Sequence, residues 1–306
     1  MGIGIDLGGT TVKGAVVNDQ GEILNNRSFK TDGFRGYPEI LNDMKELIKE
    51  LLTLSPGEKR VGIGIPGILS GDGNTIVSCP NLNWQNIPLK HDLESELALE
   101  VLLVNDATAA SIAEAAFGST QGHKNSVMIT LGTGVGGGVI LNNRIISGAH
   151  GVASEIGHLL MEKNFYTCSC GKNGCLETFA SATAIIKYCQ MQLERGRKST
   201  LRTVVDFDGK AILNAAKAGD PLAEEAVHRL AKYLGWAIAN ICGIIDPSII
   251  AIGGGLSYAG EFLLEIIKIE TIKRLTYPDI ATPEIVLARF RNEAGMIGCA
   301  NLQHYL

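Results

Sequence analysis

One imidazole and three thiols lie close together near the middle of the chain. His158, Cys168, Cys170 and Cys175 fall within 18 residues. Three cysteines and one histidine form a closed tetrahedral zinc set, which leaves no open position for a reacting molecule. The spacing therefore predicts a structural zinc ion. The alternative is three free cysteines on a loop, which is weak because exposed thiols are a liability.

Two carboxylates flank this cluster. Glu155 precedes His158 by three residues, and Glu177 follows Cys175 by two. A bound zinc would fix both carboxylates in one place, where they could accept hydrogen bonds from neighbouring sugar hydroxyls. For either glutamate taken alone, a surface position is the alternative interpretation.

Two glycine turns have the chemistry of a phosphate cradle. Residues 6–10 and residues 131–134 each combine glycine with threonine, so backbone N–H groups could converge on phosphate oxygens while the hydroxyls add donors. Lys13 would add a positive charge, and Asp6 could hold Mg²⁺ through water. Two ordinary hairpin turns are the alternative. The residues of these turns that could contact phosphate or Mg²⁺ are Asp6, Gly8, Gly9, Thr10, Thr11, Lys13, Thr133 and Gly134.

Two segments match the glycine pattern of a dinucleotide site, but their surroundings exclude that site. Residues 62–67 and 132–137 both match G-x-G-x-x-G, but such a site needs its glycines to open a helix. The first match continues into a turn-like stretch, and the second into an apolar strand with a hairpin turn. The sequence also contains no G-x-x-x-x-G-K-[ST] phosphate loop.

Asp106 follows an apolar strand expected over residues 101–104 and precedes a small-residue helix expected over 107–117. Ligands of α/β proteins bind at the carboxyl ends of strands. A carboxylate there could accept the proton of a sugar hydroxyl that attacks a phosphoryl group, with Asn105 binding neighbouring hydroxyls. The alternative is that Asn105 or Asp106 simply caps the helix.

Strands and helices alternate along the 306 residues, after an antiparallel meander expected over residues 3–27. This order predicts an α/β fold with mixed sheets, and the length is typical of two domains. We place the boundary near residue 118. The expected domains are residues 1–118, with a final helix (293–306) packing back on them, and a larger domain, 119–292, that carries the zinc loop.

Composition narrows the range of partners. The net charge is −5, from 27 basic and 32 acidic residues without a basic stripe, so we expect no nucleic-acid partner. No stretch approaches the ~20 apolar residues of a membrane span, and no signal peptide is evident, which favours the cytoplasm.

The 37 glycines exceed the roughly 21 expected, and their clustering indicates close backbone approaches.

Taken together, these segments resemble the ROK family (repressors, open reading frames and kinases) of the actin-like sugar-kinase superfamily. The resemblance spans nearly the whole chain in the family's order. It lies in residues 6–10, 64–67, 105–107, 131–138, 155–158 and 168–177. One departure is Ser154, where the family usually has glycine or alanine before the E-x-G-H glutamate.

The resemblance implies an actin-like ATPase fold with an interdomain cleft, ATP with Mg²⁺ as phosphoryl donor, and a homodimer or dimer of dimers. It makes Asp106 the catalytic base and His158 both a zinc ligand and a sugar contact. The turn at residues 253–255, including Gly254 and Gly255, joins the ATP site. The implied sugar-binding residues are Gly67, Asn81, Asn105, Asp106, Glu155, His158 and Glu177.

Within the family, residues 80–84 resemble the sugar loop of its glucokinases, which predicts conversion of glucose to glucose 6-phosphate. An N-acetylmannosamine kinase or another hexose or amino-sugar kinase is the alternative. A catalytically inactive sugar-sensing regulator is the alternative from another class, although Asp106 argues against it. The family's repressors carry a winged-helix domain first, and a phosphate turn that begins at Asp6 leaves no residues for one.

Overall fold

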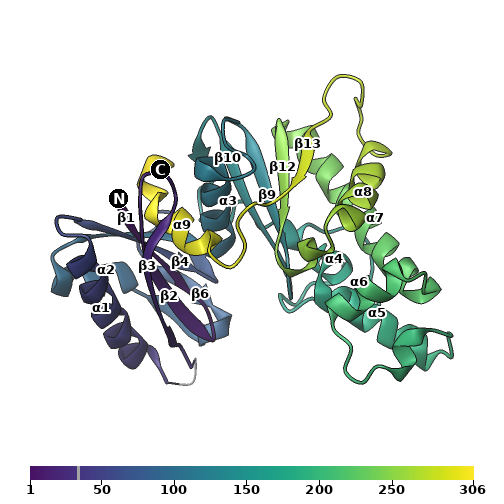
Figure 1. Cartoon of the computed structure of the whole chain (residues 1–306), viewed down its shortest axis with the longest axis horizontal. Helices are drawn as coiled ribbons and strands as arrows, with labels where there is room; N and C mark the ends of the chain where they lie inside the picture. The colour runs from purple at the N-terminus through teal and green to yellow at the C-terminus, as the bar shows by residue number, and fades with distance from the viewer. Residues whose placement is uncertain (33–34) are drawn as a thin grey trace. The chain divides into compact units, whose positions relative to one another are not determined.

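The computed structural model describes residues 1–32 and 35–306 (Figure 1). The chain divides into two compact units. The first consists of residues 1–128, 138–154 and 289–306, and the second of residues 129–137 and 155–288. The first unit extends past the expected boundary near residue 118 to residue 128, and two strands, β9 (Ser126–Leu131) and β10 (Val135–Leu141), contribute residues to both units.

The first unit is built on a mixed sheet with the strand order β3-β2-β1-β4-β8. β1, β2 and β3 pair antiparallel, which confirms the expected meander, and β1, β4 and β8 pair parallel. β3 is the largely exposed edge strand. The strands are β1 (Gly2–Leu7), β2 (Thr11–Val17), β3 (Ile23–Lys30), β4 (Arg60–Ile65) and β8 (Glu100–Asn105).

Helices and a small sheet complete this unit. The apolar stripe of α1 is buried, and Leu47 and Leu51 pack on Gly14 of β2, where a Cβ would lie only 2.8 Å from the Leu51 side chain. The helical period in the sequence therefore marks the buried face. The elements are α1 (Tyr37–Leu54), α2 (Leu89–Leu97), α3 (Asp106–Phe117), α9 (Ala294–Ala300), β5 (Ile68–Leu69), β6 (Ile76–Cys79), β7 (Trp84–Ile87) and the 3-10 turns η1 (Pro80–Leu82) and η5 (Leu302–His304).

The C-terminal helix α9 lies beside β1 and β4, as its yellow ribbon in Figure 1 shows. Glycine makes this approach possible, because a Cβ at Gly4 would overlap the carbonyl oxygen of Met296, and one at Gly62 that of Cys299. The helix is shorter than the one predicted over residues 293–306. It ends at Ala300, and a 3-10 turn follows.

The second sheet has the order β11-β10-β9-β12-β13, with β12 and β13 parallel. Its strands are β9 (Ser126–Leu131), β10 (Val135–Leu141), β11 (Arg144–Ile145), β12 (Ile249–Gly253) and β13 (Glu284–Leu287). The helical elements of the second unit are α4 (Glu177–Ala180), α5 (Ala182–Glu194), α6 (Gly209–Lys217), α7 (Pro221–Ile245), α8 (Glu261–Ile272), η2 (Ile156–His158), η3 (Thr200–Thr203) and η4 (Gly255–Ala259).

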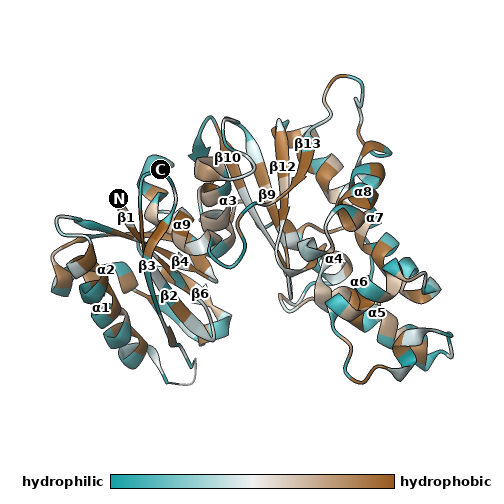
Figure 2. Cartoon of the chain, viewed as in Figure 1, coloured by the Kyte–Doolittle hydropathy of each residue, from teal (hydrophilic) through white to brown (hydrophobic). Residues whose placement is uncertain are grey.

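The long helix α7 organises the helical layer of the second unit. Asp220 caps its first turn and Pro221 begins it. Gly235 allows α8 to approach closely, because a Cβ there would lie 2.6 Å from the backbone of Glu270. Apolar residues concentrate in the strands and on the packed faces of the helices, shown brown in Figure 2. Within residues 1–32 and 35–306, no helix combines the length and apolarity needed to cross a bilayer.

Candidate active site

Three parallel strands of the first unit end at the same edge of their sheet. The register pairs Asp6 of β1 with Gly64 of β4, and Ile65 of β4 with Asn105 of β8. The sugar and nucleotide residues expected near these strand ends are therefore brought to one edge, which is where α/β proteins bind ligands.

The first glycine turn is a closed hairpin turn. The N–H of Gly8 donates to the carbonyl of Thr11 at 2.9 Å. Thr31 fixes the turn from outside, since its hydroxyl donates to the carbonyl of Gly8 at 2.7 Å and its N–H donates to the carbonyl of Thr10 at 3.0 Å. Thr10 itself is exposed, so its hydroxyl faces solvent at the tip of the turn.

Asp6 is an acid in an unusual setting. Burial raises its pKa, and the opposite charge of Lys13, its partner across β1 and β2, offsets this only in part. Gly295 leaves the space that the carboxylate occupies, because a Cβ there would lie 2.8 Å from Asp6 Cγ. A divalent cation near Asp6 would favour its charged form.

The helix cap and the candidate base are separate residues. Asn105 is the N-cap of α3, and its side-chain oxygen accepts hydrogen bonds from the N–H groups of Ala107 at 2.9 Å and Thr108 at 3.2 Å. The Asn105 amide also donates to the carbonyl of Gly67 at 3.3 Å. Asp106 is the first helical residue, is exposed, and accepts the Ala107 N–H at 2.8 Å. The capping role alone therefore does not account for Asp106.

The expected sugar loop begins in η1 and lies against the first glycine turn. A Cβ on Gly9 would be 3.1 Å from the Cβ of Asn81. Asn83 ends η1 in the left-handed conformation, and the buried Trp84 packs edge-on against Tyr37 with ring centres 5.1 Å apart. The buried ring anchors the loop while Asn81 stays exposed.

The second glycine turn is fixed by the start of α5. Ala182 N–H donates to the carbonyl of Gly132, and the hydroxyl of Thr183 donates to the carbonyl of Thr133, both at 2.8 Å. Gly254 approaches from β12 with φ of 81°, and a Cβ there would lie 2.6 Å from the backbone of Leu131. The turns at residues 131–134 and 253–255 are therefore adjacent, and Thr133, Gly254 and Gly255 are exposed.

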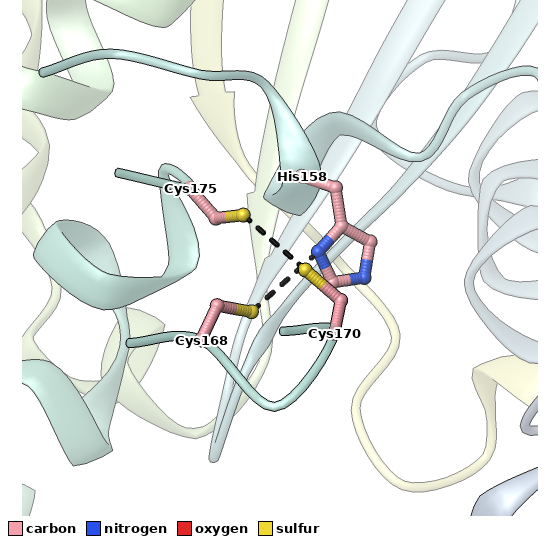
Figure 3. Close-up of side chains that lie close together, drawn as sticks. All are labelled: His158, Cys168, Cys170 and Cys175. Carbon is pink, nitrogen blue, oxygen red and sulfur yellow. Dashed lines mark hydrogen bonds between the residues drawn. The ribbon is translucent and has the colours of Figure 1, made fainter. Parts of the chain in front are cut away.

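The histidine and the three cysteines converge, as Figure 3 shows. Their ligand atoms all lie within 4.8 Å of one another. Cys168 Sγ is 3.7 Å from His158 Nδ1, and Cys170 Sγ is 3.5 Å from Cys175 Sγ. A tetrahedral zinc ion separates two sulfur atoms by about 3.8 Å and a sulfur from a nitrogen by about 3.6 Å. The four residues therefore fit such an ion.

A bound cation would also change the protonation of the thiols. Burial raises the pKa of Cys175 to about 12, whereas the backbone N–H of Lys172 lowers the pKa of Cys170. Three thiolates this close repel one another in the absence of a positive charge, and a metal ion removes that cost by holding coordinating thiols deprotonated.

Glu177 contacts both the cysteine cluster and the second glycine turn. Its Oε1 accepts a hydrogen bond from Cys168 Sγ at 3.3 Å, and its Oε2 accepts one from Val135 N–H at 3.3 Å. A Cβ on Gly134 would collide with Oε2, so glycine is needed there. Glu155 Oε2 lies 3.8 Å from His158 Nε2. The metal cluster, one turn and two carboxylates thus meet at one end of β10.

Each unit therefore assembles its own share of the predicted site residues. The first contains Asp6, Gly8, Gly9, Thr10, Thr11, Lys13, Gly67, Asn81, Asn105 and Asp106. The second contains Thr133, Gly134, Glu155, His158, Cys168, Cys170, Cys175, Glu177, Gly254 and Gly255. The two G-x-G-x-x-G matches lie in strands and turns and open no helix, which confirms their rejection.

Sequence reasoning missed a buried carboxylate in the first unit. Glu114 of α3 is fully buried and accepts N–H groups from Ser119 at 2.7 Å, Phe290 at 2.7 Å and Arg289 at 3.1 Å. It binds the backbone where the chain returns from the second unit to the first. No local spacing reveals this role, because its partners at 289 and 290 are about 175 residues away.

Comparison with known proteins places this site in a family. The ROK family model matches residues 2–305. A glucokinase of Halalkalibacterium halodurans is 38% identical over 306 residues, covering 97% of this chain and 92% of that protein. A ROK family glucokinase from Streptomyces griseus, solved with glucose and AMPPNP, has a TM-score of 0.82 at 32% identity and covers 98% of each chain.

The chain belongs to the ROK family. The predicted α/β fold with mixed sheets, of the actin-like ATPase type, is thereby confirmed. A putative xylose repressor of Caldicellulosiruptor sp. is also similar, at 31% identity over 97% of this chain and 76% of that protein. The family thus includes relatives named as enzymes and relatives named as regulators.

Proposed function

We propose that the protein is a sugar kinase that transfers the γ-phosphoryl group of ATP to the 6-hydroxyl of glucose. The observation that carries this proposal is Asp106, an exposed carboxylate at the carboxyl end of β8 whose helix is already capped by Asn105. Support comes from family membership and from the similar proteins named glucokinase.

Asp106 acts as the general base. It accepts the proton of the sugar 6-hydroxyl while the hydroxyl oxygen bonds to the γ-phosphorus and the bond from phosphorus to the bridging oxygen of ADP breaks. The products are the sugar 6-phosphate, ADP and a proton. Backbone N–H groups of the glycine turns are suited to phosphate oxygens, and Asp6 would hold Mg²⁺, which would neutralise charge on the phosphates.

Carboxylates and amides recognise the sugar. Glu155 and Glu177 accept hydrogen bonds from adjacent hydroxyls, and His158 and Asn81 add further contacts. Asn105 contributes an N–H donor rather than an acceptor, because its side-chain oxygen is committed to the cap of α3. Gly67 keeps the Asn105 amide in place through its carbonyl.

His158, Cys168, Cys170 and Cys175 would hold a structural zinc ion. The ion would supply a fixed point for the loop, since four protein ligands leave no position open for substrate. Metal analysis of the purified protein should find about one zinc per chain, and its removal by a chelator should raise the KM for sugar more than the KM for ATP. Full activity in zinc-free protein would contradict this role.

The substrate is tested with an ATP-coupled screen over glucose, mannose, fructose, allose and the N-acetylhexosamines. We expect the highest kcat/KM with glucose. A preference for N-acetylmannosamine or another amino sugar would replace glucose and keep the kinase mechanism. The location in the cytoplasm and the homodimer or dimer of dimers stay predictions.

A sugar-sensing regulator is the second candidate, favoured by the likeness to the putative xylose repressor. The same assay separates the two functions. Calorimetric binding of a sugar without formation of ADP would favour the regulator, whereas turnover that depends on Asp106 supports the kinase.

A further inference from the structure

A cation from α7 is enclosed by aromatic rings beside α4. The guanidinium carbon of Arg229 lies 4.8 Å from the ring centre of Phe179, 5.0 Å from that of Tyr233 and 5.2 Å from that of Tyr188. This burial lowers the pKa of Arg229. Phe179 and Tyr233 also pack on each other, with ring centres 4.0 Å apart. Rings on several sides restrict the directions in which the guanidinium can point.

The guanidinium points to a single amide. Arg229 donates to Asn164 Oδ1 at 2.9 Å. The Nδ2 of Asn164 then donates to both the carbonyl and the hydroxyl of Thr178, at 2.7 and 2.9 Å. The Oδ1 of Asn164 also accepts the N–H of Phe165 at 2.9 Å. Because Arg229 and this backbone group both bind the oxygen, the amide nitrogen is turned toward Thr178.

The backbone of Asn164 is tied to the cysteine loop as well. Its N–H donates to Asn173 Oδ1 at 2.8 Å, and Asn173 Nδ2 donates back to the carbonyls of Asn164 and Tyr166, both at 3.1 Å. Asn173 lies between Cys170 and Cys175. One residue thus connects the loop that carries the cysteines with the helix that carries Thr178.

This connection matters because Thr178 directly follows Glu177. Helix α4 has only four residues and no side-chain cap, and a helix this short has little stability of its own. The position of the Glu177 carboxylate, between Cys168 and the turn at Gly134, therefore depends on what holds α4 from outside.

We propose that Asn164, oriented by Arg229, is a positioning residue that places Glu177 for the sugar and fixes the cysteine loop around its metal. The proposal rests on the proposed sugar-kinase function for its kinetic consequence. Its consequence for the metal does not depend on that function. Neither residue touches the reacting atoms, so the expected signature is a change in sugar affinity and in metal release.

The test compares Asn164→Ala and Arg229→Met with the control Arg274→Met. Arg274 is a half-buried arginine of the same unit that pairs with Glu270 instead. We expect the KM for sugar to rise about tenfold or more in the first two variants, because a charged hydrogen bond and its partner amide are lost. The kcat and the KM for ATP should change less than about threefold. The double variant should match the single ones, since the two residues act as one unit.

Release of zinc to an excess of chelator supplies the second readout. The Asn164 side chain holds Thr178, whose hydroxyl and N–H both donate to the carbonyl of Cys175, at 2.8 and 2.9 Å. We therefore expect release to be at least about tenfold faster in Asn164→Ala and Arg229→Met than in the wild type and the control, although the backbone bonds to Asn173 persist. If the wild type phosphorylates no sugar, the proposed function fails while the release rates still test the positioning role. Wild-type sugar KM and release rates in folded variants would overturn the proposal, and so would equal losses in Arg274→Met.

Discussion

Replacing Asp106 by asparagine removes the proposed general base while keeping the hydrogen bond that this side chain makes to its helix. The Asp106 carboxylate accepts the N–H of Ala107 at 2.8 Å, and an asparagine oxygen in the same place can accept that bond. Asn105 still caps α3, and the side chain at position 106 is exposed, so no cavity forms. The main structural loss is the interaction of a negative charge with the N-terminus of the helix, which is about 0.3–1 kcal/mol.

The expected kinetic loss is much larger. A positioned general base contributes about 10²- to 10⁴-fold, which corresponds to about 2.7–5.5 kcal/mol of the activation barrier. The Asp106→Asn variant should therefore keep its sugar affinity and its free energy of unfolding nearly unchanged while kcat falls by at least about a hundredfold.

A coupled ADP assay, sugar-binding calorimetry and urea unfolding measure the three quantities. Glu261→Gln is the matched control, because Glu261 is the exposed first residue of α8 and loses the same charge–helix interaction. A kcat within about tenfold of wild type for pure Asp106→Asn would refute the assignment of the base. A collapse of sugar binding alongside kcat would refute the separation of roles.

Three further substitutions test the space beside Asp6, a left-handed backbone position and the cap of α7. Gly295→Ala should push the Asp6 carboxylate away, because the new Cβ would lie 2.8 Å from Asp6 Cγ. The KM for Mg-ATP should rise about tenfold while sugar binding is retained. Unchanged ATP kinetics would contradict this role of Asp6. Ser154→Gly should leave the free energy of unfolding within about 1 kcal/mol of wild type in urea unfolding, because relief of the φ of 68° is offset by the greater freedom of glycine in the unfolded chain and by loss of the hydroxyl bond to the carbonyl of Ile146. A loss of more than about 2 kcal/mol would contradict this expectation. Burial raises the pKa of Asp220, but hydrogen bonds from Ala223 and Thr200 outweigh this effect and lower the pKa below 3.8. The charged Asp220 therefore stabilises the fold above pH 3.8, and this stabilisation is lost as the pH falls through the lowered pKa. Asp220→Asn should therefore lower stability at pH 7 and flatten the loss toward pH 3, and an unchanged pH profile would contradict it.

The local parts of the site could be predicted from the sequence, and the distant ones could not. The cysteine cluster spans 18 residues, so its spacing in the sequence was enough to predict that the four ligands lie together. Asn105 and Asp106 were indistinguishable as caps, because either side chain can accept the first N–H groups of a helix. Only backbone geometry assigned the cap to Asn105.

Hydrogen bonds between residues far apart in the chain could not be predicted from any local sequence pattern. Asn164 and Arg229 are 65 residues apart, and nothing in their neighbourhoods indicates that they pair. The division into units differs from the expected boundary near residue 118 for a related reason. Strands β9 and β10 read as continuous apolar runs, and their residues belong to two compact bodies.

The glycines beneath α9 affect how a mutational scan of this protein should be interpreted. Gly4 and Gly62 leave no room for any side chain against the backbone of the last helix, so every substitution there should score as badly as loss of the general base. The cause would differ, because these variants would be depleted from the soluble fraction, whereas a catalytic variant would accumulate normally. A scan that records growth alone would merge the two groups, and paired measurement of abundance would separate them.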